Sequence, residues 1–130
     1  MYKNTFKKLN LITFLIFMLL VAFQTSCKED ETLDGSVWNA VEIVTEGEKK
    51  DTYDYTLSFF ESIFTLNLNV RSNDGYRWTE KLFGTYNYSH PNVTLYIENV
   101  TGNYNLYGVI SDNQLTIINN KDESLVFDRK

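Results

Sequence analysis

The chain has 130 residues, of which 15% are aromatic and 22% charged, with a formal net charge of −5 at pH 7. This length fits one domain, and its many Tyr and Phe residues favour strands. The single cysteine, Cys27, excludes an internal disulfide framework and a multi-cysteine metal site. The single histidine, His90, argues against a histidine-based metal cluster or a Ser-His-Asp triad. No cofactor is therefore expected.

Residues 1–26 resemble a bacterial lipoprotein signal peptide. Three lysines near the start precede an almost wholly apolar stretch at 11–23, and Cys27 follows shortly after it. About 13 apolar residues are too few for a transmembrane helix and fit the apolar region of a secretory signal. In the family, an aliphatic residue usually lies three positions before the cysteine, where this chain has Gln24. The alternative is an ordinary cleaved signal with an incidental cysteine.

Residues 27–33 are expected to form a lipidated acidic tether. A thioether to diacylglycerol would use the thiol of Cys27, and two or three acyl chains anchor a protein firmly. The charged run at 28–31 must be solvated. It resembles the export signal of surface-displayed lipoproteins, which implies the outer membrane and the cell surface; the periplasmic face is the alternative. Removing three signal lysines from −5 leaves −8, which argues against nucleic acid as a partner.

Alternating apolar and polar residues run through the rest of the chain and predict strands. The first spans 37–44, carries Trp38 and follows a turn at 34–36. The others are expected at 53–59, 64–70, 76–83, 85–89, 93–97, 104–110, 115–118 and 125–127. Asp74-Gly75 predicts a hairpin, and Gly84 within an extended run predicts a bulge or a sharp bend. Eight or nine short strands can hide their edges when a meander closes on itself.

Four segments resemble small lipocalin-like lipoproteins of Gram-negative bacteria. They are L-D-G-S-V-W at 33–38, F-G-T-Y at 83–86, Y-G-V-I-S-D-N-Q-L-T-I at 107–117 and L-V-F-D-R-K at 125–130. Such domains begin with a Gly-x-x-Trp-type strand and end on an apolar-then-basic strand. The resemblance implies an all-β fold, an eight-stranded antiparallel up-and-down barrel of the calycin type at 34–130. It carries over no catalytic residue.

Five residues are candidates for ligand contact. The resemblance implies that Trp38 closes the bottom of the barrel, with ligand stacking as the alternative. The other four candidates are even-numbered, so in one continuous strand they would lie on the same side: Trp78, Glu80, Tyr86 and Tyr88. If that side faces inward, Glu80 is a carboxylate inside the barrel, which needs a partner or a raised pKa; pairing with cations at the surface is the alternative. The tyrosines suit amphipathic ligands, although core packing explains them equally.

Binding is therefore the leading function, either of a small apolar or amphipathic ligand inside the barrel or of a partner protein at its rim. The rival is an inhibitor or immunity-type protein that blocks a cationic enzyme or toxin, since acidity speeds such association. A structural subunit of a surface complex is a third reading. No enzymatic activity is expected, because one histidine and one lipidated cysteine assemble no nucleophile-base pair. An open cavity lined by Tyr and Leu would favour a carrier of a small ligand. A filled interior with an acidic rim would favour an inhibitor.

Overall fold

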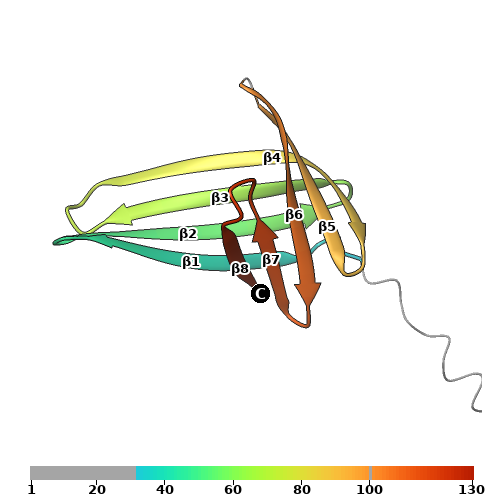
Figure 1. Cartoon of the computed structure of the whole chain (residues 1–130), viewed down its shortest axis with the longest axis horizontal. Helices are drawn as coiled ribbons and strands as arrows, with labels where there is room; N and C mark the ends of the chain where they lie inside the picture. Colours follow the sequence, from blue (N-terminus) through green and yellow to red (C-terminus); the bar gives the residue numbers. More distant parts are fainter. Residues whose placement is uncertain (1–31, 100) are drawn as a thin grey trace, which may run out of the picture. The chain divides into compact units, whose positions relative to one another are not determined.

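The computed structural model describes residues 32–99 and 101–130, which form a closed barrel of eight antiparallel strands (Figure 1). The strands follow one another around the barrel in chain order. They are β1 Val37–Glu46, β2 Lys49–Phe60, β3 Ile63–Ser72, β4 Arg77–Ser89, β5 Asn92–Asn99, β6 Gly102–Ser111, β7 Gln114–Ile118 and β8 Ser124–Arg129. The predicted eight-stranded antiparallel barrel is confirmed. The expected signal peptide, Cys27 and the tether up to residue 31 lie outside the described residues.

The two halves of the barrel differ in strand length. The first four strands have 10, 12, 10 and 13 residues, whereas β7 and β8 have 5 and 6. In Figure 1, β1 to β4 run side by side, and the later strands cross their direction steeply. The β1–β2 and β3–β4 hairpins therefore extend past the crossing strands, and residues 41–46 of β1 are all exposed. The barrel is open at this end.

The interior follows from the register of the strands. Side chains alternate between the two sides of a strand, and residues paired across strands share a side. Trp38 pairs with Leu57, which pairs with Leu66, so this side faces inward. The buried core comprises Leu33, Trp38, Ala40, Leu57, Phe59, Phe64, Val93, Leu95, Ile97, Ile110, Leu115, Ile117 and Phe127. Leu33, the last residue of the expected tether, is thus part of the core. With its own core and a closed sheet, the barrel has what a domain needs to fold alone.

Of the two alternatives predicted for Gly84, a bulge and a sharp bend, the bulge is absent. β4 keeps one register against β3 from Thr85 to Arg77, and Gly84 also pairs with Ile97 of β5. A Cβ atom at Gly84 would lie 1.9 Å from the backbone oxygen of Tyr96. The glycine therefore allows a close approach of backbones where β4 passes from β3 to β5. Side chains therefore alternate between the two sides of β4 along its whole length, without a shift at Gly84.

The hairpin predicted at Asp74-Gly75 is present and is tied to its neighbour. Gly75 has a φ of 92°, which glycine adopts without steric cost. The side chain of Asn73 donates to the carbonyl oxygen of Glu48 at 2.8 Å and accepts from the backbone N–H of Lys50 at 3.1 Å. The tips of the β1–β2 and β3–β4 hairpins are thereby joined.

The barrel closes through a short contact between β1 and β8, which we call the seam. Only Trp38 with Arg129 and Asn39 with Asp128 are paired there, and the backbone N–H of Lys130 donates to the carbonyl oxygen of Val37 at 2.9 Å. Each of the other ladders contains between 5 and 10 residue pairs. Within the described residues, β1 beyond Asn39 therefore has a strand neighbour on one side only.

Candidate functional site

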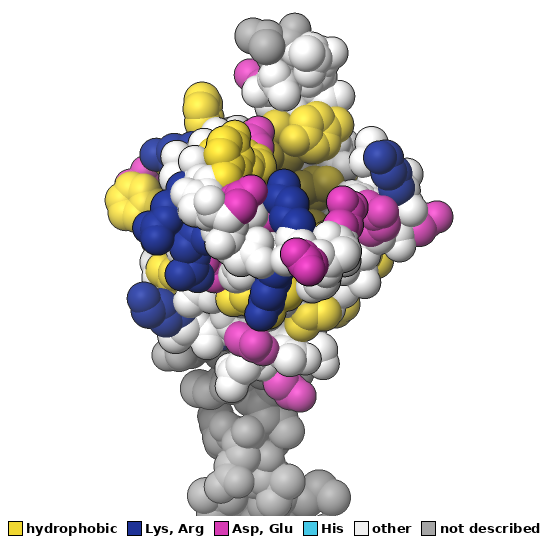
Figure 2. Space-filling view, turned by 90° about the vertical axis from the view of Figure 1, so that its left-hand side faces the viewer, with side chains coloured by type: hydrophobic (Ala, Val, Ile, Leu, Met, Phe, Trp, Pro, Cys, Tyr) yellow, Lys and Arg dark blue, Asp and Glu magenta, His cyan; other side chains and the backbone are white. Residues whose placement is uncertain are grey.

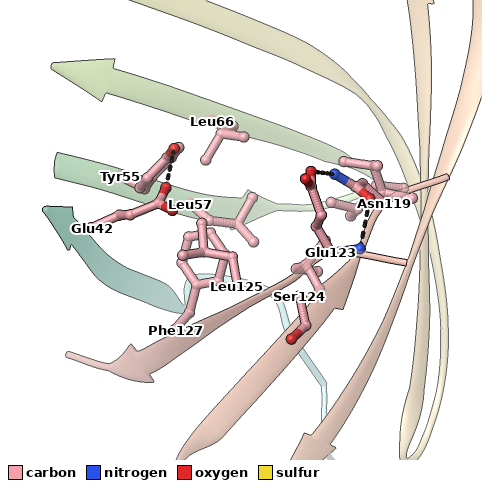
Figure 3. Close-up of a pocket in the computed structure, with 12 residues that line it drawn as sticks. Glu42, Tyr55, Leu57, Leu66, Asn119, Glu123, Ser124, Leu125 and Phe127 are labelled. Carbon is pink, nitrogen blue, oxygen red and sulfur yellow. Dashed lines mark hydrogen bonds between the residues drawn. The ribbon is translucent and has the colours of Figure 1, made fainter. Parts of the chain in front are cut away.

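A cavity of about 400 Å³ occupies the open end of the barrel (Figure 3). Figure 2 looks along the long strands from their hairpin tips and shows hydrophobic side chains set back in a hollow of this face. All strands except β4 contribute to the lining, together with the turn between β7 and β8. The lining residues are Glu42, Tyr55, Leu57, Leu66, Leu95, Leu106, Ile117, Asn119, Glu123, Ser124, Leu125 and Phe127.

The walls of this cavity are apolar. Leu57, Leu95 and Phe127 are only 1%, 1% and 2% exposed, and Leu66, Leu106 and Leu125 pack against the same core. The volume lies within the range of about 300–1,000 Å³ that is typical of small-molecule sites. It equals the liquid volume of about 13 water molecules. Apolar walls offer such waters few hydrogen bonds, so an apolar ligand would displace them favourably.

The opposite end of the barrel is closed by Trp38. Its side chain is 0% exposed. The indole Nε1–H donates to Ser36 Oγ at 2.9 Å, and that hydroxyl donates to the carbonyl oxygen of Leu33 at 2.6 Å. The guanidinium carbon of Arg129 lies 5.5 Å from the centre of the indole ring, within the range of a cation-π interaction. Trp38 thus seals this end and does not line the cavity.

The polar groups of the site gather at what we call the mouth, formed by Glu42, Tyr55, Asn119, Glu123 and Ser124. On one side, the hydroxyl of Tyr55 donates to Glu42 Oε2 at 3.3 Å (Figure 3). Burial, and then the charge and hydrogen bond of Glu42, raise the pKa of Tyr55 to about 12. Tyr55 therefore stays neutral near pH 7 and acts as a hydrogen-bond donor to the carboxylate.

On the other side, Asn119 organises the turn between β7 and β8. Its Oδ1 accepts from the backbone N–H groups of Lys121 at 2.9 Å and Glu123 at 3.0 Å. Its Nδ2 donates to Glu123 Oε2 at 2.9 Å. These bonds hold the Glu123 carboxylate beside the cavity, as Figure 3 shows. Among the described residues, neither Glu42 nor Glu123 forms an ion pair with a basic side chain.

Charge is divided between the two sides of the long strands. The inner side of β1 to β4 carries four carboxylates and one amine, namely Glu42, Glu46, Asp51, Glu80 and Lys49. The outer side carries one carboxylate and four cations, namely Asp54, Lys50, Arg71, Arg77 and Lys81. The inner side has four negative charges and one positive charge, a net charge of −3. The outer side has four positive charges and one negative charge, a net charge of +3. Figure 2 shows the Lys and Arg side chains gathered mainly on one side of this face.

Two candidates from the sequence, Trp78 and Glu80, lie on the inner side of β4. Trp78 pairs with Val70 and is half-buried, whereas Glu80 pairs with Leu68 and is exposed. The hypothesis of a carboxylate enclosed in the barrel is therefore wrong for Glu80. Its parity is inward, but it lies on the part of β4 that extends past the crossing strands.

The two candidate tyrosines, Tyr86 and Tyr88, are engaged elsewhere. The ring of Tyr86 packs edge-on against Phe59 with ring centres 4.8 Å apart, and its hydroxyl donates to the carbonyl oxygen of Glu61 at 2.7 Å. The hydroxyl of Tyr88 lies 2.8 Å from His90 Nδ1. Like Trp38, Trp78 and Glu80, they do not line the cavity, so none of these five residues enters our proposal as a ligand contact.

Sequence reasoning missed the residues of the mouth. Glu42 has the same parity as the buried Trp38 and Ala40, so an inward carboxylate could have been found by extending the first strand's alternation. Asn119 and Glu123 belong to a turn, and no periodic signal places a turn residue beside a cavity.

Comparison with known proteins identifies no relative of this chain. No family model, curated protein or solved structure matches the chain. Residues 32–99 and 101–130 contain no helix long and apolar enough to cross a membrane. In the same part of the chain, no three His, Cys, Asp or Glu side chains are grouped as metal ligands would be. The cavity is therefore the feature of the described residues that bears on function.

Proposed function

We propose that this protein is a lipid-anchored binding protein of the bacterial outer membrane that takes a small amphipathic molecule into the open end of its barrel. The observation that carries this proposal is the apolar cavity of about 400 Å³ with polar groups confined to its mouth. Binding sites for small molecules combine apolar walls with a few placed polar groups in this way.

The arrangement favours a ligand with two chemically different ends. An apolar chain would lie against the leucines and Phe127, where each buried methylene contributes about 0.8 kcal/mol. A polar head would remain at the mouth, near Glu42 and Glu123. Because Trp38 seals the other end of the barrel, the ligand would enter and leave through the mouth. This role is one of binding and needs no catalytic group.

The proposed location of the protein at the outer membrane is based on its sequence. Cys27 would carry the lipid, with residues 28–31 as the acidic export signal and display on the cell surface. A closed barrel with Arg129 over Trp38 near the start of its first strand supports grouping the domain with the lipocalin-like lipoproteins. Such a protein would hold its ligand or pass it on at the outer face of the cell.

Native mass spectrometry on residues 28–130, released from the lipid after gentle purification from the native envelope, tests the proposal. We expect a reproducible mass excess that is lost on denaturation. Leu106→Trp should abolish the excess because it fills the cavity. Val109→Trp is the matched control, since Val109 lies on the same strand but is 45% exposed on the outer side. A bare mass for the parent would overturn the carrier and favour a protein partner at the acidic rim.

A further inference from the structure

We infer that the ligand carries a positive charge, so that the site selects an amphipathic organic cation, an apolar chain or ring system with an amine head. The inference depends on the proposed function, because it names the class of ligand that the same cavity would bind. The sign of the ligand's charge is inferred from the charged residues around the cavity. The apolar walls alone would not select a ligand by its charge.

The two carboxylates at the mouth each have a neutral hydrogen-bond partner. Glu42 Oε2 accepts from the Tyr55 hydroxyl at 3.3 Å, and Glu123 Oε2 accepts from Asn119 Nδ2 at 2.9 Å. Each carboxylate therefore keeps a second oxygen with further capacity to accept hydrogen bonds. Both partners are neutral groups, so they orient the carboxylates without cancelling their charge.

Few cations lie where they could compensate the charge of these carboxylates. No Lys or Arg lines the cavity. Lys49 is the one basic residue on the inner side of β1 to β4, and it pairs with Asp51 at 3.5 Å. The turn that holds Glu123 also contains Lys121 and Asp122, one charge of each sign. The surroundings of the mouth are therefore negative overall.

Electrostatic attraction and desolvation together decide which charged head binds at the mouth. A head at the mouth stays partly in water, so it avoids most of the desolvation cost that burial of an ion carries. A cation gains attraction from both carboxylates, and an anion on the same chain meets repulsion from both. The apolar chain supplies affinity in either case, and the head decides between ligands.

Three probes with the same octyl chain separate these contributions: octylamine, which is protonated at pH 7, 1-octanol and octanoate. Isothermal titration calorimetry on residues 32–130 at low salt should rank them in that order. Each charge–carboxylate interaction at an exposed site changes affinity by up to about fivefold. The two carboxylates together should therefore make octylamine bind roughly 9- to 25-fold tighter than 1-octanol, with the advantage shrinking at high salt.

Variants of the mouth test the assignment to residues. Glu42→Gln and Glu123→Gln each keep an acceptor oxygen but remove the charge. Each should weaken octylamine binding by about threefold to fivefold and leave 1-octanol binding unchanged. Glu98→Gln is the matched control, because Glu98 is an exposed carboxylate of β5 outside the cavity lining. It should leave all three affinities as they are.

The outcomes distinguish this inference from the proposed function. If none of the three probes binds the folded domain, both are overturned. If 1-octanol or octanoate binds as tightly as octylamine, or if the two mouth variants behave like Glu98→Gln, the cavity still binds amphiphiles and only the charge selectivity is overturned.

Discussion

Replacing Trp38 with phenylalanine decides whether this residue seals the barrel or contacts ligand. The indole is 0% exposed and donates to Ser36 Oγ at 2.9 Å. Losing one buried hydrogen bond costs about 1 kcal/mol, and the smaller ring leaves a partial cavity that costs roughly another 1 kcal/mol. The Ser36 hydroxyl keeps its acceptor at Leu33, so no stranded donor adds to the cost. We expect the free energy of unfolding to fall by about 2 kcal/mol in total.

Urea titration followed by circular dichroism measures this change without relying on tryptophan fluorescence. For a domain of this size, the loss corresponds to a melting temperature lower by about 8–16 °C. Trp78→Phe is the matched control, because Trp78 is only half-buried, and it should cost about 0.5 kcal/mol or less. If Trp38→Phe leaves stability within about 0.5 kcal/mol of the parent but weakens octylamine binding, then the sealing role is refuted in favour of ligand stacking.

Two further predictions concern Gly84 in β4 and Tyr55 at the mouth. Gly84→Ala should lower the free energy of unfolding by about 3 kcal/mol or more, because its Cβ would lie 1.9 Å from the Tyr96 backbone oxygen. Asn87→Ala on the exposed side of β4 is the control, and equal urea midpoints for the two variants would contradict the reasoning. The pKa of Tyr55, raised to about 12, adds stability that is complete below pH 10 and is lost as pH rises from 10 through 12. Tyr55→Phe should flatten this loss in urea titrations at pH 9 to 12, and parallel losses in both proteins would contradict it.

Much of the fold was predictable because the alternation of apolar and polar residues is local. The residues around Phe64, Leu66 and Leu68 alternate without interruption, and the structure places them in β3 as expected. The hairpin at Asp74-Gly75 was predictable from the positive φ that glycine permits. These features depend on neighbouring residues alone, and no contact from another strand overrides them.

Gly84 shows where local reasoning leaves alternatives open. A glycine in a strand indicates a bulge or a close backbone approach, and only the position of Tyr96, 12 residues later in the chain, decides between them. Glu80 shows where local reasoning fails. Its inward parity was correct, but parity does not say whether the opposite wall reaches that far. The long β1 to β4 strands extend past the short β7 and β8 strands, and Glu80 is exposed there.

The seam between β1 and β8 has a consequence for the order in which the barrel forms. Every other ladder joins consecutive strands, so it closes only a short loop of chain and can form early. The seam joins Trp38 to Arg129. Forming it costs more loop-closure entropy than any other ladder, and only two residue pairs offset this cost. We therefore expect circularisation to be the last step of folding and the seam to open first on heating. Amide hydrogens at the seam should exchange with solvent through this partial opening, well before the β2–β3 hairpin unfolds.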